Sequence, residues 1–243
     1  YSTAARFSWR PTQKHGFTFY ADMVPVDWLA TTATALGSYE AQTEYKTEVD
    51  SLIQPQWKWT PNNQWLLEVG QSYKLSRSAF LAVDTADPNI PSVLDVATGI
   101  RTRAPAVLLD PILVNAPNGR ASATLVAGGH NLKFGSQWQY GYFDLSFSTY
   151  GDVNYLTALG NPVAVLYWAT PFLQRMNIKA NLAFYAQDQW QYKRLTLNLG
   201  LRHDWVNGYI PEYTVPATRF AAALPIKRHD NLPNYKDISP RLG

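Results

Sequence analysis

Apolar and polar residues alternate one by one along two neighbouring stretches, Met176–Gln189 and Leu195–Val206. In the first stretch, one set of alternate positions is apolar: Met176, Ile178, Ala180, Leu182, Phe184 and Ala186. The second stretch has leucine at alternate positions from 195 to 201, with polar residues or glycine between them. Side chains of an extended strand point to opposite faces in turn, whereas an amphipathic helix would need spacings of three and four. The pattern predicts a hairpin with one apolar and one polar face, which turns near Lys193.

The same scheme recurs in three further pairs of stretches, each joined by a brief polar turn that contains Pro, Gly or Asn. The predicted pairs are Ala5–Arg10 with Phe17–Asp22, Gln56–Trp59 with Trp65–Tyr73, and Arg120–Ala127 with His130–Tyr140. Much longer segments separate the hairpins and are predicted to be loops: Val24–Gln54, Lys74–Gly119, Gly141–Arg175 and Asn207–Ile238. Short periplasmic turns combined with long extracellular loops are typical of outer-membrane barrels.

The stretches predict an all-β fold, an antiparallel up-and-down transmembrane β-barrel with about eight strands in this chain. A ninth strand is predicted to start near Ser239. Because lipid does not tolerate an unpaired strand edge, residues 1–243 are expected to be a fragment of one larger barrel domain. The start, Tyr1–Trp9, does not resemble a signal peptide, which would have a basic stretch followed by about 7–15 apolar residues.

The composition agrees with a wall that has one lipid face and one wet face. Aromatic residues make up 14% of the chain and charged residues only 16%, against roughly 25% charged residues in soluble domains. No uninterrupted apolar stretch approaches the roughly 18 residues of a membrane-spanning helix. The formal net charge is +3, but Lys and Arg are spread along the chain, which argues against a nucleic-acid-binding patch.

Most tryptophans fall next to the predicted short turns, where they would form a girdle at the periplasmic membrane interface. These candidates are Trp9, Trp57, Trp59, Trp65, Trp190 and Tyr192. Trp205 follows Leu195 by ten residues, which is roughly 23 Å of membrane height at about 3.3 Å per residue and a tilt near 45°. We expect Trp205 at the opposite interface. The alternative is a soluble extracellular β-sandwich that binds glycans through exposed aromatics, since frequent Trp and Tyr suit that fold as well.

The polar sides of the predicted strands supply candidates that face the barrel interior: Lys133, Gln137, Asn181, Gln187, Asn198 and Arg202. They would contact a solute or a plug domain, or hydrogen-bond neighbouring strands, because any barrel interior is polar. The four histidines are not placed beside a nucleophile in a catalytic pattern. No Cys and no paired His spacing offers a metal site. The chain is therefore predicted to be neither an enzyme nor a carrier of a metal or cofactor.

Two stretches of the last hairpin, Leu182–Trp190 and Arg194–Arg202, together with Ile238–Gly243, are similar to the barrel of Oar-like TonB-dependent receptors. Weaker likenesses to that barrel lie at Gly129–Gly135 and Phe7–Asp22. The resemblance implies a barrel of about 22 strands in the bacterial outer membrane, surrounded by outer-membrane lipid. It implies transport of a large, unknown solute, driven by the inner-membrane TonB complex through a plug domain inside the barrel. The plug, the signal peptide and the remaining strands are expected outside residues 1–243.

Overall fold

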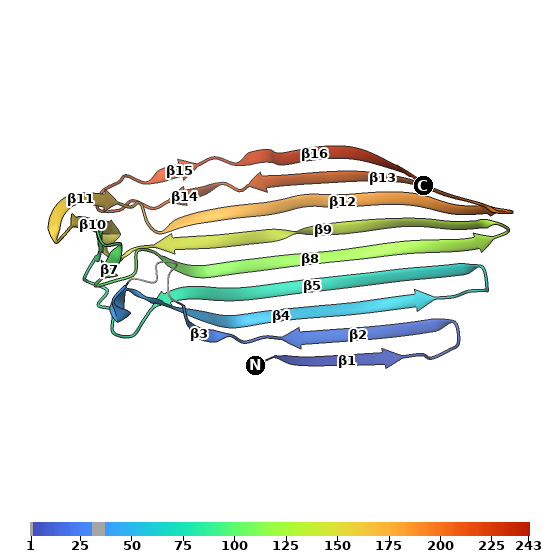
Figure 1. The fold of residues 1–243 in the computed structure, drawn as a ribbon, viewed down its shortest axis with the longest axis horizontal. Coiled ribbons are helices and arrows are strands. Elements are labelled where there is room, and N and C mark those ends of the chain that lie inside the picture. The colour runs from blue at the N-terminus through green and yellow to red at the C-terminus, as the bar shows by residue number, and fades with distance from the viewer. Residues whose placement is uncertain (1, 31–36) are drawn as a thin grey trace.

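The computed structural model describes residues 2–30 and 37–243. Its main element is an antiparallel sheet in which consecutive long strands lie side by side (Figure 1). The strands follow one another across the sheet in the order β1 (Thr3–Trp9), β2 (His15–Met23), β4 (Thr43–Trp59), β5 (Trp65–Ala82), β8 (Leu108–Ala127), β9 (His130–Ser148), β12 (Phe172–Tyr192), β13 (Leu195–Ile210) and β16 (His229–Leu242). A short strand, β3 (Asp27–Ala30), pairs with the first residues of β4. The main sheet is therefore an antiparallel meander, as predicted for the wall of an up-and-down barrel.

Short turns lie at one end of the meander, and the described parts of the long connections lie at the other (Figure 1). The short turns comprise residues 10–14, 60–64, 128–129 and 193–194. We call their end of the sheet the turn end and the opposite end the loop end. Antiparallel strands joined in sequence order require this separation. The predicted hairpin topology, with turns near Lys14, Asn62, Gly128 and Lys193, is confirmed.

The two five-residue turns share one local design. Each has Pro as its second residue and a short polar side chain as its third, in Arg10-Pro-Thr-Gln-Lys14 and Thr60-Pro-Asn-Asn-Gln64. Thr12 Oγ1 accepts hydrogen bonds from the backbone N–H groups two and three residues later, both at 3.2 Å. Asn62 Oδ1 does the same at 2.9 and 3.1 Å. Proline fixes φ and the side-chain oxygen closes the turn, so the sequence itself ends one strand and begins the next.

The strand register divides the sheet into two chemically different faces. Residues directly opposite one another in a ladder share a face, and Arg120 lies opposite Gln137, which lies opposite Ala183. The alternate positions of the same strands carry apolar residues such as Phe184 and Leu199. We call the side that contains Arg120 and Gln137 the polar face, and the other side the apolar face.

No large apolar side chain is buried among residues 2–28 and 37–243. The buried apolar residues are all small: Ala41, Ala79, Val83, Ala104, Val153, Ala180, Ala183 and Val215. By contrast, Phe184 and Leu201 are 58% and 54% exposed. A soluble protein would cover such residues with a second layer. The meander is a single layer, so the alternative of a two-layer β-sandwich is wrong.

The strands extend much further into the predicted loop segments than the alternation indicated. β4 begins at Thr43, β5 continues to Ala82, β8 begins at Leu108 and β9 continues to Ser148. β16 begins at His229, ten residues before the predicted start of a ninth strand near Ser239. These extensions contain proline and mixed polar residues, which weaken the two-residue period. Sequence pattern therefore identified the turn-end halves of the strands and missed the loop-end halves.

The alternation predicted from Met176 to Ala186 is also interrupted. A β-bulge between Ile178 and Ala180 shifts the register of β12 against both neighbouring strands. A bulge inserts one extra residue into one strand, so Met176 and Ile178 do not continue the alternating row that runs from Ala180 to Ala186. The rest of the predicted hairpin pairs as expected, from Asn181 opposite Val206 to Tyr192 opposite Leu195.

Two of the long connections fold together into a small sheet at the loop end. β6 (Ser92–Asp95) and β7 (Ile100–Thr102) come from the β5–β8 connection, and β10 (Val153–Ala158) and β11 (Asn161–Tyr167) come from the β9–β12 connection. Their order is β11-β10-β6-β7, with β10 and β6 parallel. We call this four-stranded unit the loop sheet.

Further short elements complete the loop end. β14 (Tyr213–Val215) and β15 (Leu224–Ile226) form a two-stranded ribbon between β13 and β16. Two 3₁₀ turns are also present: η1 (Tyr39–Ala41) directly precedes β4, and η2 (Tyr150–Asp152) lies between β9 and β10. Within the described part of the chain, no helix is long and apolar enough to cross a membrane.

Candidate functional site: two faces of one wall

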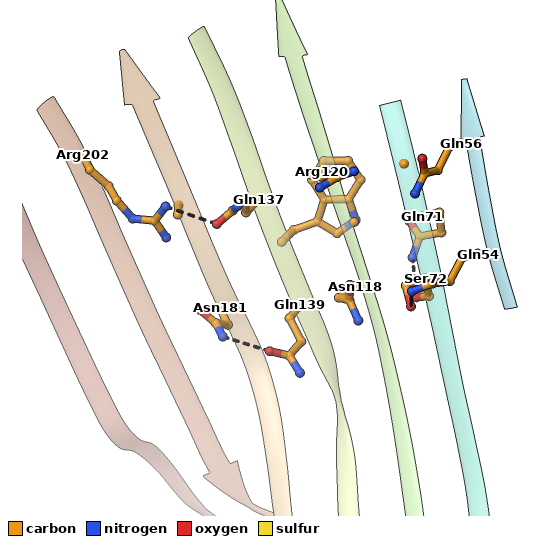
Figure 2. A pocket seen from close by; sticks show the side chains of 14 residues that line it. Gln54, Gln56, Gln71, Ser72, Asn118, Arg120, Gln137, Gln139, Asn181 and Arg202 are labelled. Atoms are coloured by element: carbon orange, nitrogen blue, oxygen red, sulfur yellow. Dashed lines mark hydrogen bonds between the residues drawn. The ribbon is translucent and has the colours of Figure 1, made fainter. Parts of the chain in front are cut away.

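The polar face has a shallow hollow of about 470 Å³ between β4 and β13 (Figure 2). Its polar lining consists mainly of amide side chains and two arginines: Gln54, Gln56, Ser72, Asn118, Arg120, Gln137, Gln139, Asn181 and Arg202. These residues come from six neighbouring strands of the meander. Amide groups both donate and accept hydrogen bonds, so the hollow presents both kinds of group to whatever lies against it.

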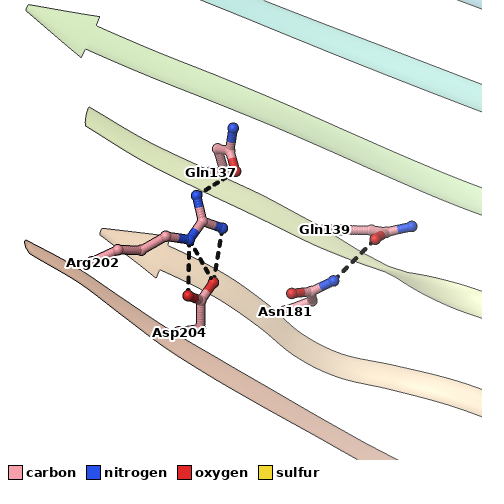
Figure 3. Close-up of polar contacts among 5 residues, drawn as sticks. All are labelled: Gln137, Gln139, Asn181, Arg202 and Asp204. Atoms are coloured by element: carbon pink, nitrogen blue, oxygen red, sulfur yellow. Dashed lines mark hydrogen bonds and ion pairs between the residues drawn. The ribbon is translucent and has the colours of Figure 1, made fainter. Parts of the chain in front are cut away.

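Cross-strand hydrogen bonds tie the side chains of the polar face together (Figure 3). Asn181 Nδ2 donates to Gln139 Oε1 at 3.1 Å. Arg202 donates two bonds from Nε and one from a terminal nitrogen to the Asp204 carboxylate, at 2.8–3.0 Å. Its other terminal nitrogen donates to Gln137 Oε1 at 3.2 Å. The guanidinium is thus held between β13 and β9, over the intervening strand β12.

All six polar candidates from the sequence lie on the polar face. Lys133 is opposite Gln187, Gln137 is opposite Ala183, and Asn198 is opposite Gln189. Gln137, Asn181 and Arg202 line the hollow together. Lys133 and Gln187 instead line a neighbouring recess nearer the turn end, beside Tyr185 and Arg202. Four further lining residues were not among the candidates: Gln54, Gln56, Asn118 and Arg120. The same two-residue period could have identified Gln56 and Arg120 in their predicted strands, whereas Gln54 and Asn118 fall in segments predicted to be loops.

The apolar face carries aromatic rings at the turn end. Trp57 is stacked against Phe17, Trp59 and His15, with ring centroids 5.9–6.4 Å apart. Trp190 is stacked against Tyr192 and His130 at 5.7–5.9 Å. The ladders place Trp9 opposite Phe17, and Trp65 opposite Leu125, on this same face. All six turn-end aromatics predicted from the sequence therefore share the apolar face.

Trp205 lies on the apolar face nearer the loop end. Its ladder partner is Leu182, which in turn lies opposite Trp138. Its Nε1 donates a hydrogen bond to Asn234 Oδ1 at 3.1 Å, and the Lys236 ammonium lies 5.9 Å from its ring centroid. Between this aromatic level and the turn-end level, most residues of the face are aliphatic or Phe: Ile53, Leu67, Val69, Ala121, Ala123, Leu132, Phe134, Phe184, Leu199 and Leu201. Ser136, Asp188 and His203 also lie on this face. Trp138 was not among the predicted interface aromatics, because it falls late in a predicted strand, away from any turn.

Histidines lie among the turn-end aromatics in structural contacts. His15 Nδ1 accepts a hydrogen bond from Trp57 Nε1 at 3.2 Å. His130 Nδ1 lies 2.6 Å from Asp188 Oδ2. Neither contact includes a Ser or Thr hydroxyl that a histidine could activate. Among residues 2–30 and 37–243, no group of three or more His, Cys, Asp or Glu side chains could hold a metal ion.

Comparison with known families gives one match over the full length. A family model described as TonB dependent receptor-like, beta-barrel, matches residues 1–243. No curated protein matches the sequence significantly.

Proposed function

The chain belongs to the TonB-dependent receptor-like β-barrel family, and from this premise we propose that its two faces separate membrane lipid from a path for a large solute. Proteins of this family are transporters of the bacterial outer membrane and not enzymes. This chain is accordingly an outer-membrane barrel domain that serves transport and works with TonB.

We propose that the apolar face contacts the hydrocarbon of the outer membrane. The observation that carries this proposal is the row of large apolar side chains that no second protein layer covers, including Phe134 and Leu199 at 46% and 45% exposure. In water these side chains would be costly to expose, whereas in lipid they need no protein partner. The two levels of aromatic rings suit the two membrane interfaces, where Trp and Tyr rings keep one edge in contact with water. In this arrangement Trp9, Trp57, Trp59, Trp65, Trp190 and Tyr192 lie at the periplasmic interface, and Trp205 at the outer one.

We propose that the polar face lines the lumen and that its hollow borders the path of the solute or the surface of a plug domain. The support is the continuous array of amides and arginines that includes Asn118, Gln137 and Arg202. A plug that fills the lumen and engages the TonB complex is part of this proposal, as is membership of the Oar-like subfamily. The solute is unidentified, and a surface rich in hydrogen-bonding groups suits peptides or oligosaccharides better than apolar molecules.

We further propose that the two outer strands of the meander pair with other strands of a larger barrel. Within the described residues, β1 pairs only with β2, and β16 pairs only with β13. Each outer strand therefore leaves one row of backbone N–H and C=O groups unpaired. Such groups cost several kcal/mol each in hydrocarbon, so a closed barrel around a lumen requires partners on both sides.

Single-cysteine labelling tests the assignment of the faces. The chain contains no cysteine, so Gln137→Cys and Ser136→Cys each introduce one thiol into the full-length protein at adjacent positions on opposite faces. A water-soluble, membrane-impermeant maleimide is expected to label Gln137→Cys in purified outer membranes and to leave Ser136→Cys unmodified. A lipid-soluble maleimide should show the opposite preference. Equal labelling by both reagents would contradict the two-faced wall.

Solute depletion tests the transport path separately. Cells that produce the full-length protein are incubated with mixtures of peptides and oligosaccharides too large for porins, and the medium is analysed by mass spectrometry. Loss of a solute only when both the protein and TonB are present supports the proposal. A Gln137→Trp substitution, which fills the hollow from the lumen side, is expected to reduce that uptake at unchanged protein abundance. Uptake that is unaffected by loss of TonB would contradict it.

A further inference from the structure

A second cavity, of about 350 Å³, lies at the loop end between β8, β9, β12 and β14. Its walls are mostly apolar: Pro111, Leu113, Pro171, Leu173, Val215 and Pro216. It shares no lining residue with the hollow of the polar face. On β9, Asp144 in this cavity lies six residues beyond Trp138 toward the loop end, so the cavity is outside the aliphatic band between the two aromatic levels. It is therefore a separate cavity from the hollow of the polar face.

The polar groups of this cavity have unused hydrogen-bonding capacity. Asp144 is only 8% exposed, and its Oδ1 is buried without a hydrogen-bond partner. Its Oδ2 lies 3.2 Å from Arg175 Nε, but the Nε–H does not point at that oxygen and is itself left without a hydrogen bond. A buried carboxylate oxygen or guanidinium N–H without a partner is costly. The cavity thus offers one strong acceptor and one strong donor side by side.

Tyr213 adds a third polar group at the rim of the same cavity. Burial raises the pKa of its hydroxyl, so the side chain stays neutral at physiological pH. The opposite charges of Asp144 and Arg175 offset one another. A charged ligand would therefore gain little net Coulomb energy from the pair to offset the desolvation of its charge, whereas a neutral ligand has no such cost.

We propose that this cavity binds a small, uncharged amphipathic molecule whose apolar body packs against Leu113, Leu173 and Val215. Its amide or hydroxyl group donates to Asp144 Oδ1 and accepts from Arg175 Nε. An apolar pocket with a few convergent polar groups is the usual form of a small-molecule site. The site lies among the loops, where outer-membrane proteins meet molecules from outside the cell.

Benzamide and benzoate form a matched pair of probes, because they have nearly the same shape but only benzamide can donate a hydrogen bond and is uncharged. Binding to the full-length protein in lipid nanodiscs is measured by ligand-observed NMR. Benzamide is expected to bind about tenfold more tightly than benzoate, the effect of one hydrogen bond to a charged group. Asp144→Asn removes the negative charge and leaves Arg175 without its counter-ion, so the preference should reverse in favour of benzoate. Asp237→Asn, in the polar face of β16, is the control and should leave the preference unchanged.

A second variant keeps the test decisive if Asp144→Asn does not fold. Leu173→Trp fills the cavity and leaves both members of the ion pair in the chain, and it should reduce benzamide binding about tenfold or more while the thermal unfolding temperature stays close to that of the parent. Equal affinity of the parent protein for both probes, or benzamide binding that survives Leu173→Trp, would overturn the proposal. Either result would mean that water alone satisfies the Asp144 oxygen.

Discussion

The ring of Tyr185 on β12 lies directly over Gly135 on β9, its ladder partner on the polar face. A Cβ at position 135 would be 2.3 Å from Cζ and Oη of that ring. Glycine in the middle of a strand normally weakens it, but here the missing side chain makes room for a ring that covers the exposed backbone. Trp138 covers Gly119 in the same way on the apolar face, with ring atoms 2.4 Å from the position of a Cβ.

Gly135→Ala is therefore expected to displace the Tyr185 ring and to lower the free energy of unfolding by about 1–3 kcal/mol, the usual effect of overpacking. Gly200→Ala on the same face is the control, because its Cβ would meet neighbours at an ordinary 3.6–3.8 Å. Urea unfolding of the full-length protein in lipid vesicles gives both values. In a Tyr185→Ala background the penalty of Gly135→Ala should disappear, and its persistence would show that the ring is not the cause.

The assignment of faces on β13 predicts unequal effects of arginine at adjacent positions. Leu199→Arg places a charge on the apolar face, where an arginine near the membrane midplane costs about 2–4 kcal/mol. Asn198→Arg places the same charge on the polar face, where water and polar groups solvate it. Unfolding free energies of the two full-length variants in bilayers are the measurement. Equal costs, or a larger cost for Asn198→Arg, would show that β13 does not present its leucines to lipid.

Asp95 links the two halves of the loop sheet and predicts a pH dependence there. Its carboxylate accepts hydrogen bonds from the Thr98 and Gly160 backbone N–H groups at 3.1 and 2.8 Å and from the Thr157 hydroxyl at 3.1 Å. These bonds, led by the one from Gly160, hold the pKa of Asp95 well below its ordinary value. A carboxyl group with a lowered pKa in the folded state stabilises that state above the unfolded-state pKa, and this stabilisation is lost as the pH falls toward the folded-state pKa.

Amide hydrogen exchange of Thr98 and Gly160 measures this effect. Protection factors, corrected for intrinsic exchange, should stay constant from about pH 7 to about pH 5 and decrease below about pH 4, the unfolded-state value for Asp. Asp95→Asn should lower the protection at neutral pH and remove most of the pH dependence. Asp87→Asn is the matched control, since its carboxylate bonds only within its own turn to Asn89. An unchanged pH profile in Asp95→Asn would assign the dependence to another group.

The turn between β4 and β5 offers a comparison of two adjacent asparagines. Asn62→Ala removes the oxygen that accepts two backbone hydrogen bonds, and we expect a loss of about 1 kcal/mol in unfolding free energy. Asn63→Ala, one residue later in the same turn, should change it by less than about 0.5 kcal/mol, as is usual for exposed positions. Chemical denaturation in vesicles distinguishes the two, and equal losses would contradict the role given to Asn62.

The turn-end part of the wall could be predicted from sequence because three local signals agree there. The alternation of apolar and polar residues predicts which side chains share a face, as for Leu199 and Asn198. Pro, Gly and Asn indicate the positions of the turns, and Trp marks the ends of the strands. The polar candidates followed from the same alternation. Their contacts with one another, such as Arg202 with Gln137 from β9, depend on the pairing of strands far apart in sequence, which alternation within a strand does not specify.

The loop end could not be predicted because its structure depends on distant partners. Asp95 and Thr157 are joined by a hydrogen bond across 62 residues of chain, and the strands that carry them are too short to show a period. The cavity around Asp144 likewise needs β14 from a third connection to form its wall. Only the long-range pairing of these segments creates the sites, so no local pattern indicates them.

The register shifts of the meander all lie on the loop side of the Trp205 level. They fall after Thr47 in β4, after Ser78 in β5, after Leu109 in β8, after Ile178 in β12 and after Asn207 in β13. A shift of one residue within the membrane would exchange the lipid side and the lumen side of a whole strand. With the Trp205 level at the outer membrane interface, as proposed above, the extra residues lie outside the hydrocarbon, and insertions and deletions in the loops can be accommodated without altering the wall. In that arrangement the bulges separate the outer surface from the part of the wall in lipid, so that a change of length in one does not shift the register of the other.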